Sequence, residues 1–130
     1  MSMDPIADFL TIIRNGVMVA KPFVVINYSK MKNSISQILK NEGFIRDFQA
    51  YDKDGKKFLK LVLKYVDGES VIHEITRIST PGRRKYVGCK EIRPVVGNLG
   101  ISIITTNQGV LSQKQAKKST VGGELLCTVW

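Results

Sequence analysis

The sequence predicts an α+β fold with an α/β N-terminal half and a mostly β C-terminal half. In the first half, two segments with apolar residues at helical spacing alternate with short β-rich stretches, which indicates two helices on a small three-stranded sheet. In the second half, short apolar runs stand between glycine-containing turns and accompany one short helical segment. We expect residues 1–66 and 67–130 to form two domains.

The first predicted helix lies in the stretch DPIADFLTIIRNG. Asp4 is a candidate N-cap, and Pro5 suits the first helical position because its φ is already helical and its missing N–H is not needed there. The apolar residues at helical spacing are Ile6, Phe9, Leu10 and Ile13. We expect this helix to end at or soon after Gly16.

A second helix follows the short β-branched strand FVVIN at residues 23–27. Ser29 is its expected cap and Gly43 its expected end. Its apolar face consists of Met31, Ile35, Ile38 and Leu39. Lys30 and Lys32 lie in the first turn, where positive charge opposes the helix macrodipole. An anionic partner would offset this unfavourable placement.

The stretch DKDG predicts a hairpin between strands at residues 44–51 and 56–65, because Asp-Gly favours a tight turn. In the second of these strands, leucines alternate with Lys60, Val62 and Lys64, so both lysines should face outward. Residues 71–78, VIHEITRI, are expected to form a further strand.

The C-terminal half begins with a break in this pattern at residues 79–100, a boundary or long connecting loop rich in proline, glycine and basic residues. A β-branched strand is expected at residues 100–106, and Ser112 with Gln115 form a capping box that starts a short basic helix. The closing strand at residues 124–130 should alternate strictly. One face would hold Leu126 and Thr128, the other Leu125, Cys127 and Val129.

The net charge of +9 arises from 20 Lys and Arg against 11 Asp and Glu, which favours a polyanionic partner. Residues 1–74 carry a net +2 and residues 75–130 a net +7, so most of the field comes from the second half. Nucleic acid is the first candidate and an anionic membrane surface the second. No apolar run approaches the roughly 20 residues that span a bilayer, and we expect a soluble, cytoplasmic protein.

Catalytic and metal-binding patterns are missing from the sequence. Cys89 and Cys127 lie far apart, and His73 is the single histidine, so we expect no metal site, no cofactor and buried, reduced thiols. His73 is interpreted as a half-buried strand residue. The carboxylates are scattered and no phosphate-binding loop follows a strand, so the protein is not expected to be an enzyme.

Two polar stretches remain as candidates for RNA contact. In PGRRKY, Arg84 and its basic neighbours can neutralise phosphates and Tyr86 can stack on a base, although a solvated charge run explains them equally well. In TTNQG, a hairpin with Asn107 or Gly109 at positive φ is the simplest interpretation. That turn does not explain Thr105, Thr106 or Gln108, whose groups suit base edges and ribose hydroxyls because they both donate and accept.

Six stretches occur in an order that resembles bacterial small-subunit ribosomal protein eight: MDPIADFLTIIRNG, SKMKNSI, LKNEGFI, ISTPGRRKYVG, LGISIITTNQGVLS and VGGELLCTVW. The resemblance runs from end to end. It implies a structural constituent of the small ribosomal subunit, a primary binder of the central domain of small-subunit ribosomal RNA that helps to organise its assembly. It also implies an α+β N-terminal half and a mostly β C-terminal half.

The resemblance assigns Thr105, Thr106 and Asn107 to an RNA-contacting turn, with Tyr86 and Glu124 shaping the same surface. The chain differs from the usual motif: Thr105 and Asn107 replace serines, and Gln108 replaces a basic residue, which should cost one phosphate contact. Nearby lysines would supply the lost charge, namely Lys114, Lys117 and Lys118. A second contact region is implied around Arg14, Asn15, Ser29, Lys30 and Lys32.

The expected partners are therefore small-subunit ribosomal RNA and neighbouring small-subunit ribosomal proteins. Repression of the protein's own messenger RNA is a second role that the family performs in some bacteria, through the same surface. An RNA-modifying enzyme would need a cofactor pocket or clustered acid and base residues. A peripheral membrane module would need an amphipathic helix, and SQKQAKKS lacks an apolar face.

Overall fold

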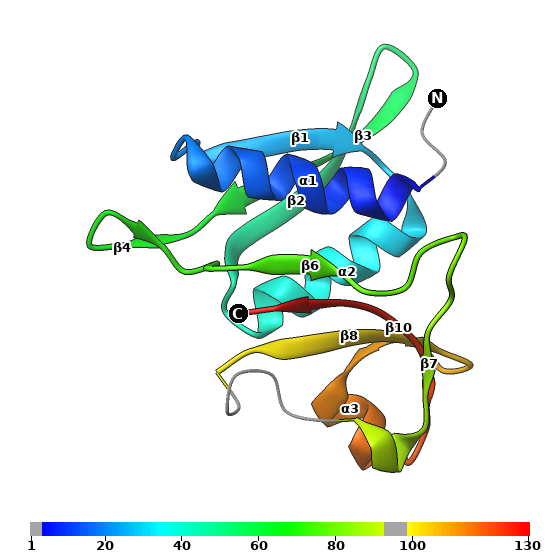
Figure 1. Ribbon diagram of the computed structural model, residues 1–130. Coiled ribbons are helices and arrows are strands. Elements are labelled where there is room, and N and C mark those ends of the chain that lie inside the picture. Colours follow the sequence, from blue (N-terminus) through cyan, green and yellow to red (C-terminus); the bar gives the residue numbers. More distant parts are fainter. Residues whose placement is uncertain (1–3, 93–98) are drawn as a thin grey trace.

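The computed structural model describes residues 4–92 and 99–130 and has the α+β architecture that the sequence predicts (Figure 1). In the N-terminal half, two helices pack on an antiparallel sheet of strand order β1-β3-β2. These elements are α1 (Pro5–Met18), β1 (Phe23–Asn27), α2 (Lys30–Asn41), β2 (Ile45–Lys53) and β3 (Lys56–Leu63). A small hairpin of β4 (Tyr65–Val66) and β5 (Glu69–Ser70) projects beyond them.

The C-terminal half contains a second antiparallel sheet of order β6-β10-β8-β9, with β7 also pairing with β10. Its strands are β6 (Ile75–Arg77), β7 (Tyr86–Val87), β8 (Ile101–Thr106), β9 (Gly109–Ser112) and β10 (Gly123–Val129). The helix α3 (Gln113–Lys118) packs beside β8 and β9, and a 3-10 turn spans Cys89–Glu91. The last strand of the sequence is therefore central to its sheet.

The helix ends confirm the caps expected from sequence. Asp4 Oδ1 accepts a hydrogen bond from the Ala7 amide at 3.2 Å, and Ser29 Oγ accepts one from the Lys32 amide at 3.1 Å. Helix α1 continues two residues beyond Gly16. A side chain at position 16 itself would collide with Val24. The capping box of Ser112 at the start of α3 is also formed.

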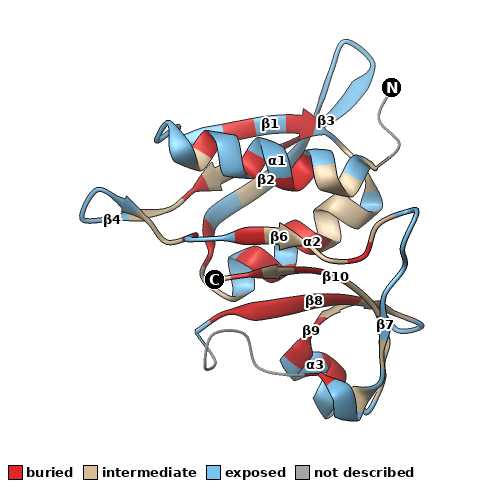
Figure 2. Cartoon of the chain, viewed as in Figure 1, coloured by how far each residue is buried: buried red, intermediate tan, exposed pale blue. Residues whose placement is uncertain are grey.

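One hydrophobic core joins both halves of the chain (Figure 2). Leu10 and Leu61 from the first half belong to the same buried cluster as Ile75, Ile103 and Val129 from the second. A smaller cluster, around Ile92, Ile104 and Ala116, lies under α3. The division of the chain into domains at residue 66 stays a prediction.

The predicted strand at residues 71–78 is wrong at both ends, because only Ile75–Arg77 pairs in the sheet. The carbonyl oxygen of Trp130 accepts hydrogen bonds from the amides of both His73 and Glu74, at 2.6 and 2.9 Å. Two successive amides directed at one acceptor cannot continue a regular ladder. His73 is consequently exposed rather than half-buried in a strand, and its ring lies 5.1 Å from that of Trp130.

The expected strict alternation along β10 is also wrong. The pairing with β8 shifts between Leu125 and Cys127, so Leu126 occupies a β-bulge. Leu125 therefore joins the smaller cluster, while Leu126, Cys127 and Val129 all pack in the main core. Burial raises the pKa of the Cys127 thiol to about 12, an effect that the charge of Arg77 only partly offsets.

Both cysteines are free, but Cys89 is only partly buried. Within residues 4–92 and 99–130, no group of three or more His, Cys, Asp or Glu side chains could hold a metal ion. Each helix in these ranges is too short or too polar to span a bilayer.

Two arginines attach β6 to the rest of the fold. Arg77 Nε lies 3.3 Å from Asp4 Oδ2, and its Nη1 donates to the carbonyl oxygen of Leu126 at 2.9 Å. The side chains of Arg77 and Asp4 are only 9% and 19% exposed. Arg14 Nη2 donates to the carbonyl oxygen of Ile75. Asp4 thus caps α1 and also connects that helix to β6.

We expect Asp4→Asn to lower the free energy of unfolding by about 1 to 2 kcal/mol, because Arg77 loses its ionic partner while the cap is kept. Asp4→Ala should cost about 1 kcal/mol more, since the cap is lost as well. Urea denaturation of both variants measures the difference. Equal losses would show that the cap does not contribute separately.

Candidate nucleic-acid interface

The structure brings together three of the predicted site residues from distant parts of the sequence. Glu124 at the start of β10 is paired with Tyr86 of β7 on one side and with Thr105 of β8 on the other. Because neighbouring strands lie about 4.8 Å apart, the three residues form a row across the end of the sheet. We call this row, with the adjoining hairpin tip at residues 106–108, the turn surface.

Two glycines permit this close packing. A Cβ on Gly122 would lie 2.3 Å from the Val87 carbonyl oxygen, and a Cβ on Gly123 would lie 2.1 Å from that of Thr105. Any side chain at either position would therefore separate β10 from β7 or β8. The sequence analysis did not single out this glycine pair. Consecutive glycines at the start of a strand were the available signal.

The hairpin between β8 and β9 presents the polar tip. Thr106 Oγ1 donates to the Gly109 carbonyl oxygen at 2.9 Å and accepts from the Gln108 amide at 3.0 Å. Gly109 has the positive φ, +107°, which resolves the alternative left open by the sequence. Asn107 and Gln108 are exposed, whereas Thr105 is half-buried. Thr106 thus shapes the turn from which the two amide side chains project.

A network of hydrogen bonds holds Glu124 in place. Its Oε2 accepts from Arg84 Nη1 at 2.9 Å and from Ser79 Oγ, and Ser79 Oγ in turn accepts from the Lys85 amide at 3.1 Å. Burial raises the pKa of Glu124, but these hydrogen bonds and the charges of Arg84 and Arg77 outweigh burial and lower the pKa below its ordinary value. Sequence analysis missed Ser79 and Arg77.

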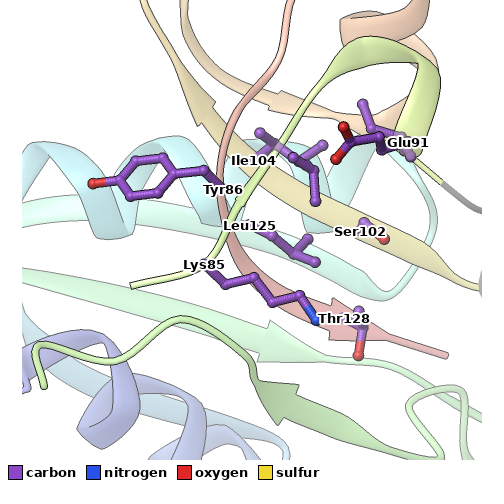
Figure 3. A pocket seen from close by; sticks show the side chains of 9 residues that line it. Lys85, Tyr86, Glu91, Ser102, Ile104, Leu125 and Thr128 are labelled. Atoms are coloured by element: carbon purple, nitrogen blue, oxygen red, sulfur yellow. The ribbon is translucent and has the colours of Figure 1, made fainter. Parts of the chain in front are cut away.

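Tyr86 is available for stacking. Tyr86 is 69% exposed, and its side chain points away from an open hollow on the other face of the sheet, which its neighbours Lys85 and Val87 line (Figure 3). The floor of the hollow is formed by Ile104 and Leu125, with Lys85 and Glu91 at its sides. Glu91 Oε2 accepts the amide of Gly88 at 3.4 Å, within its own 3-10 turn. The carboxylate beside the hollow is therefore already hydrogen-bonded within its own 3-10 turn.

The lysines of α3 differ in their surroundings. Lys117 and Lys118 are exposed in the last turn, where positive charge favours the helix macrodipole. Lys114 Nζ instead lies 3.9 Å from Glu42 Oε2, just beyond the end of α2. Lys114 thus has a carboxylate partner, whereas Lys117 and Lys118 are exposed at the end of α3.

The predicted second contact region is divided by the structure. Ser29 and Lys32 line a groove with Arg84, so the start of α2 lies beside the loop that precedes β7. Lys30 is exposed at the same helix start. Ser29 Oγ is occupied as the helix cap, and Lys32 Nζ donates to the Asn27 carbonyl oxygen at 3.3 Å. This part of the region is continuous with the loop that carries Arg84.

Arg14 and Asn15 lie elsewhere. They are about ten residues along α1 from its capped end, which corresponds to roughly 15 Å at 1.5 Å per residue. Arg14 is held by the Ile75 carbonyl oxygen, and Asn15 lines a different groove beside Phe23. These two residues are therefore not brought together with Ser29 and Lys32.

Comparison with known proteins agrees with this architecture. The family model described as Ribosomal protein S8 matches residues 4–130. The chain belongs to this family. Among similar proteins named small ribosomal subunit protein uS8, the Thermus thermophilus protein is 49% identical over 100% of both chains. Those of Rhodopirellula baltica and Variovorax paradoxus are 49% and 51% identical over 99% of both chains.

Ribosomal protein S8 family members are structural proteins of the ribosome, which in bacteria is cytoplasmic, and they are not enzymes. The family match confirms the resemblance deduced from the six sequence stretches.

We expect the stability of the protein to fall as the pH is lowered through the depressed pKa of Glu124. A carboxyl whose pKa is lowered by folding contributes stability above its unfolded value, close to 4.5, and loses that contribution on protonation in the folded state. Chemical denaturation from about pH 7 to about pH 3 should show a shallower decline in Glu124→Gln than in the unaltered chain. Parallel declines would contradict the assigned hydrogen bonds.

Gly123→Ala should separate β10 from β8 at the turn surface, because the new Cβ meets the Thr105 carbonyl oxygen and lies 3.1 Å from the Thr106 Cα. We expect a loss of about 1 to 3 kcal/mol in the free energy of unfolding. Gly82→Ala is the matched control, since no atom lies within 4 Å of its Cβ and its φ is not in the left-handed region. Thermal unfolding should leave that control within about 0.5 kcal/mol of the unaltered chain.

Proposed function

We propose that this protein is a structural constituent of the small ribosomal subunit that binds the central domain of small-subunit ribosomal RNA and helps to organise its assembly. The observation that carries the proposal is the turn surface, where Tyr86, Glu124 and Thr105 are aligned on three adjacent strands beside a projecting polar tip. The relatives named small ribosomal subunit protein uS8 support the assignment.

In this proposal, the tip reads an irregular element of the RNA. Asn107 and Gln108 present amides that both donate and accept, so they can bind base edges and ribose hydroxyls. Tyr86 offers an exposed ring on which a base can stack. Specificity then comes from groups that a rigid hairpin holds in place, which limits the entropy lost on binding.

The basic residues supply the sequence-independent part of the affinity. Lys117 and Lys118 can contact phosphates beside the tip, while Lys30 and Lys32 extend the contact toward α2. Arg84 has two roles, because its guanidinium holds Glu124 while its side chain as a whole remains 48% exposed. An RNA strand bound along these elements would also offset the unfavourable position of Lys30 and Lys32 at the start of α2.

The same surface would bind a messenger RNA that presents the same structure as the ribosomal site. Repression of the protein's own messenger is accordingly a secondary role within this proposal.

The first test compares binding to a central-domain fragment of small-subunit ribosomal RNA with binding to an unrelated RNA of equal length, over a salt series. We expect much tighter binding to the central-domain fragment that persists at moderate salt. Equal and steeply salt-dependent binding to both RNAs would refute site-specific recognition.

Two substitutions separate the proposed roles. Asn107→Ala should weaken binding to the central-domain fragment by about 1 kcal/mol or more without changing the salt slope, because a base contact is lost. Lys117→Ala should reduce the magnitude of the slope by about 0.7 to 0.9 on either RNA, because one phosphate contact is lost. These sites are better than Thr106 and Arg84, which also hold the hairpin and Glu124. Identical behaviour of the two variants would contradict the division.

A further inference from the structure

The strand β1 is an open edge of the N-terminal sheet, because among the described strands it pairs only with β3. Two hydrogen bonds at its ends show which residues of β1 bond to β3. The Leu63 amide donates to the Pro22 carbonyl oxygen, and the Tyr28 amide donates to the Lys57 carbonyl oxygen. Antiparallel pairing alternates, so Val24 and Ile26 bond to β3. The amides and carbonyls of Phe23, Val25 and Asn27 consequently point away from β3, toward the open side.

The same edge is unusually apolar. The side chains of Phe23 and Val25 are 43% and 41% exposed on the outer face of the sheet. On the helix side, Ile12 of α1 and Val19, the residue that follows α1, are 38% and 67% exposed, and all four residues line one groove along β1. Figure 2 shows buried and exposed residues alternating along this strand.

The groove is built on a fixed backbone. Tyr65 Oη donates to the Lys21 carbonyl oxygen at 2.6 Å, which anchors the segment that leads into β1. Gly16 at the groove floor is buried against Val24. An added strand would therefore meet a preformed surface, with little ordering required of this chain.

The opposite edge of the N-terminal sheet differs from β1 in its charges and in the regularity of its pairing. Strand β2 carries charged residues along its length and a bulge between Ile45 and Asp47, and Asp47 forms an ion pair with Lys40 at 3.0 Å. Charges and bulges are the usual means of preventing further strands from pairing. Strand β1 has neither within Phe23–Asn27, and its register with β3 shows no shift.

The charges around the groove determine which kind of partner segment it can bind. Lys21 lines the groove, and Lys60 lies on the outer face with its Nζ 4.3 Å from the centre of the Phe23 ring. Among the described residues that line the groove, none is acidic. A second copy of this chain would bring its own Lys21 and Lys60 to the same edge, and like charges repel. An acidic strand would be attracted.

We propose that β1 and its groove bind an extended segment of another protein by strand addition. The segment would carry apolar residues at the alternate positions that face α1 and acidic residues among those that face Lys60. Its backbone would pair with the outward amides of Phe23, Val25 and Asn27 and with the carbonyls of Phe23 and Val25, because the Asn27 carbonyl already accepts a hydrogen bond from Lys32. This surface is separate from the turn surface, and the proposal does not depend on RNA binding.

The probe is a blocked peptide of about eight residues in which valine and glutamate alternate, titrated into the full chain and followed by backbone amide NMR. We expect shifts centred on Phe23, Val25 and Asn27, with slower hydrogen exchange of the Val25 amide. A peptide with lysine in place of glutamate should bind more weakly, because Lys21 and Lys60 repel it.

Val25→Pro removes an outward amide without removing a hydrogen bond to β3, a position where edge strands tolerate proline. It should weaken binding of the acidic peptide about fivefold or more. Lys60→Glu leaves the backbone unchanged, and it should weaken binding of the acidic peptide while strengthening binding of the lysine peptide. Lys53→Glu, the same change of charge on the opposite edge strand, is the matched control and should leave both affinities unchanged.

Three results would overturn the proposal: unchanged affinity in Val25→Pro, equal effects of Lys60→Glu and Lys53→Glu, or shifts centred on other amides. Larger shifts of the same amides with a single-stranded RNA would assign the surface to RNA instead. Sedimentation showing self-association that Val25→Pro abolishes would assign it to a second copy. If Val25→Pro does not fold, as judged by circular dichroism, the two lysine variants decide the question.

Discussion

The pairing of β10 is the constraint on which the C-terminal half depends. This strand bonds to β8 along one edge and to both β7 and β6 along the other, so a single segment near the end of the sequence aligns strands that begin at residues 75, 86 and 101. Gly122 and Gly123 make that alignment sterically possible at the turn surface. Without it, Tyr86, Glu124 and Thr105 would have no fixed relation to one another.

Charged groups connect this sheet to the rest of the molecule without being left unpaired. Arg77 bonds to Asp4 and to the backbone of Leu126, and its charge also helps to lower the pKa of Glu124. Glu124 is in turn held by Arg84 and Ser79. The helix cap Asp4 and the surface proposed to bind RNA are therefore linked through the same set of charged groups. These partly buried charges are tolerated because each has partners.

The protein presents two surfaces of different chemistry. The turn surface is polar, lies in the half with a net charge of +7, and offers groups suited to RNA. The open edge of β1 is apolar, has backbone groups that point away from β3, and suits a protein strand. Asn15 illustrates the separation, because it lines the groove along β1. A component of a large assembly can use both at once.

Local rules in the sequence determined the helix caps at Asp4, Ser29 and Ser112, the β2–β3 hairpin and the polar tip, since each depends on residues a few positions apart. Residue chemistry singled out the PGRRKY and TTNQG stretches, and the family resemblance added Glu124 to them. Only the tertiary structure decided the short β6, the exposure of His73, the bulge at Leu126 and the partners of Arg84. These features arise from hydrogen bonds and packing between segments far apart in the chain, which no local pattern encodes.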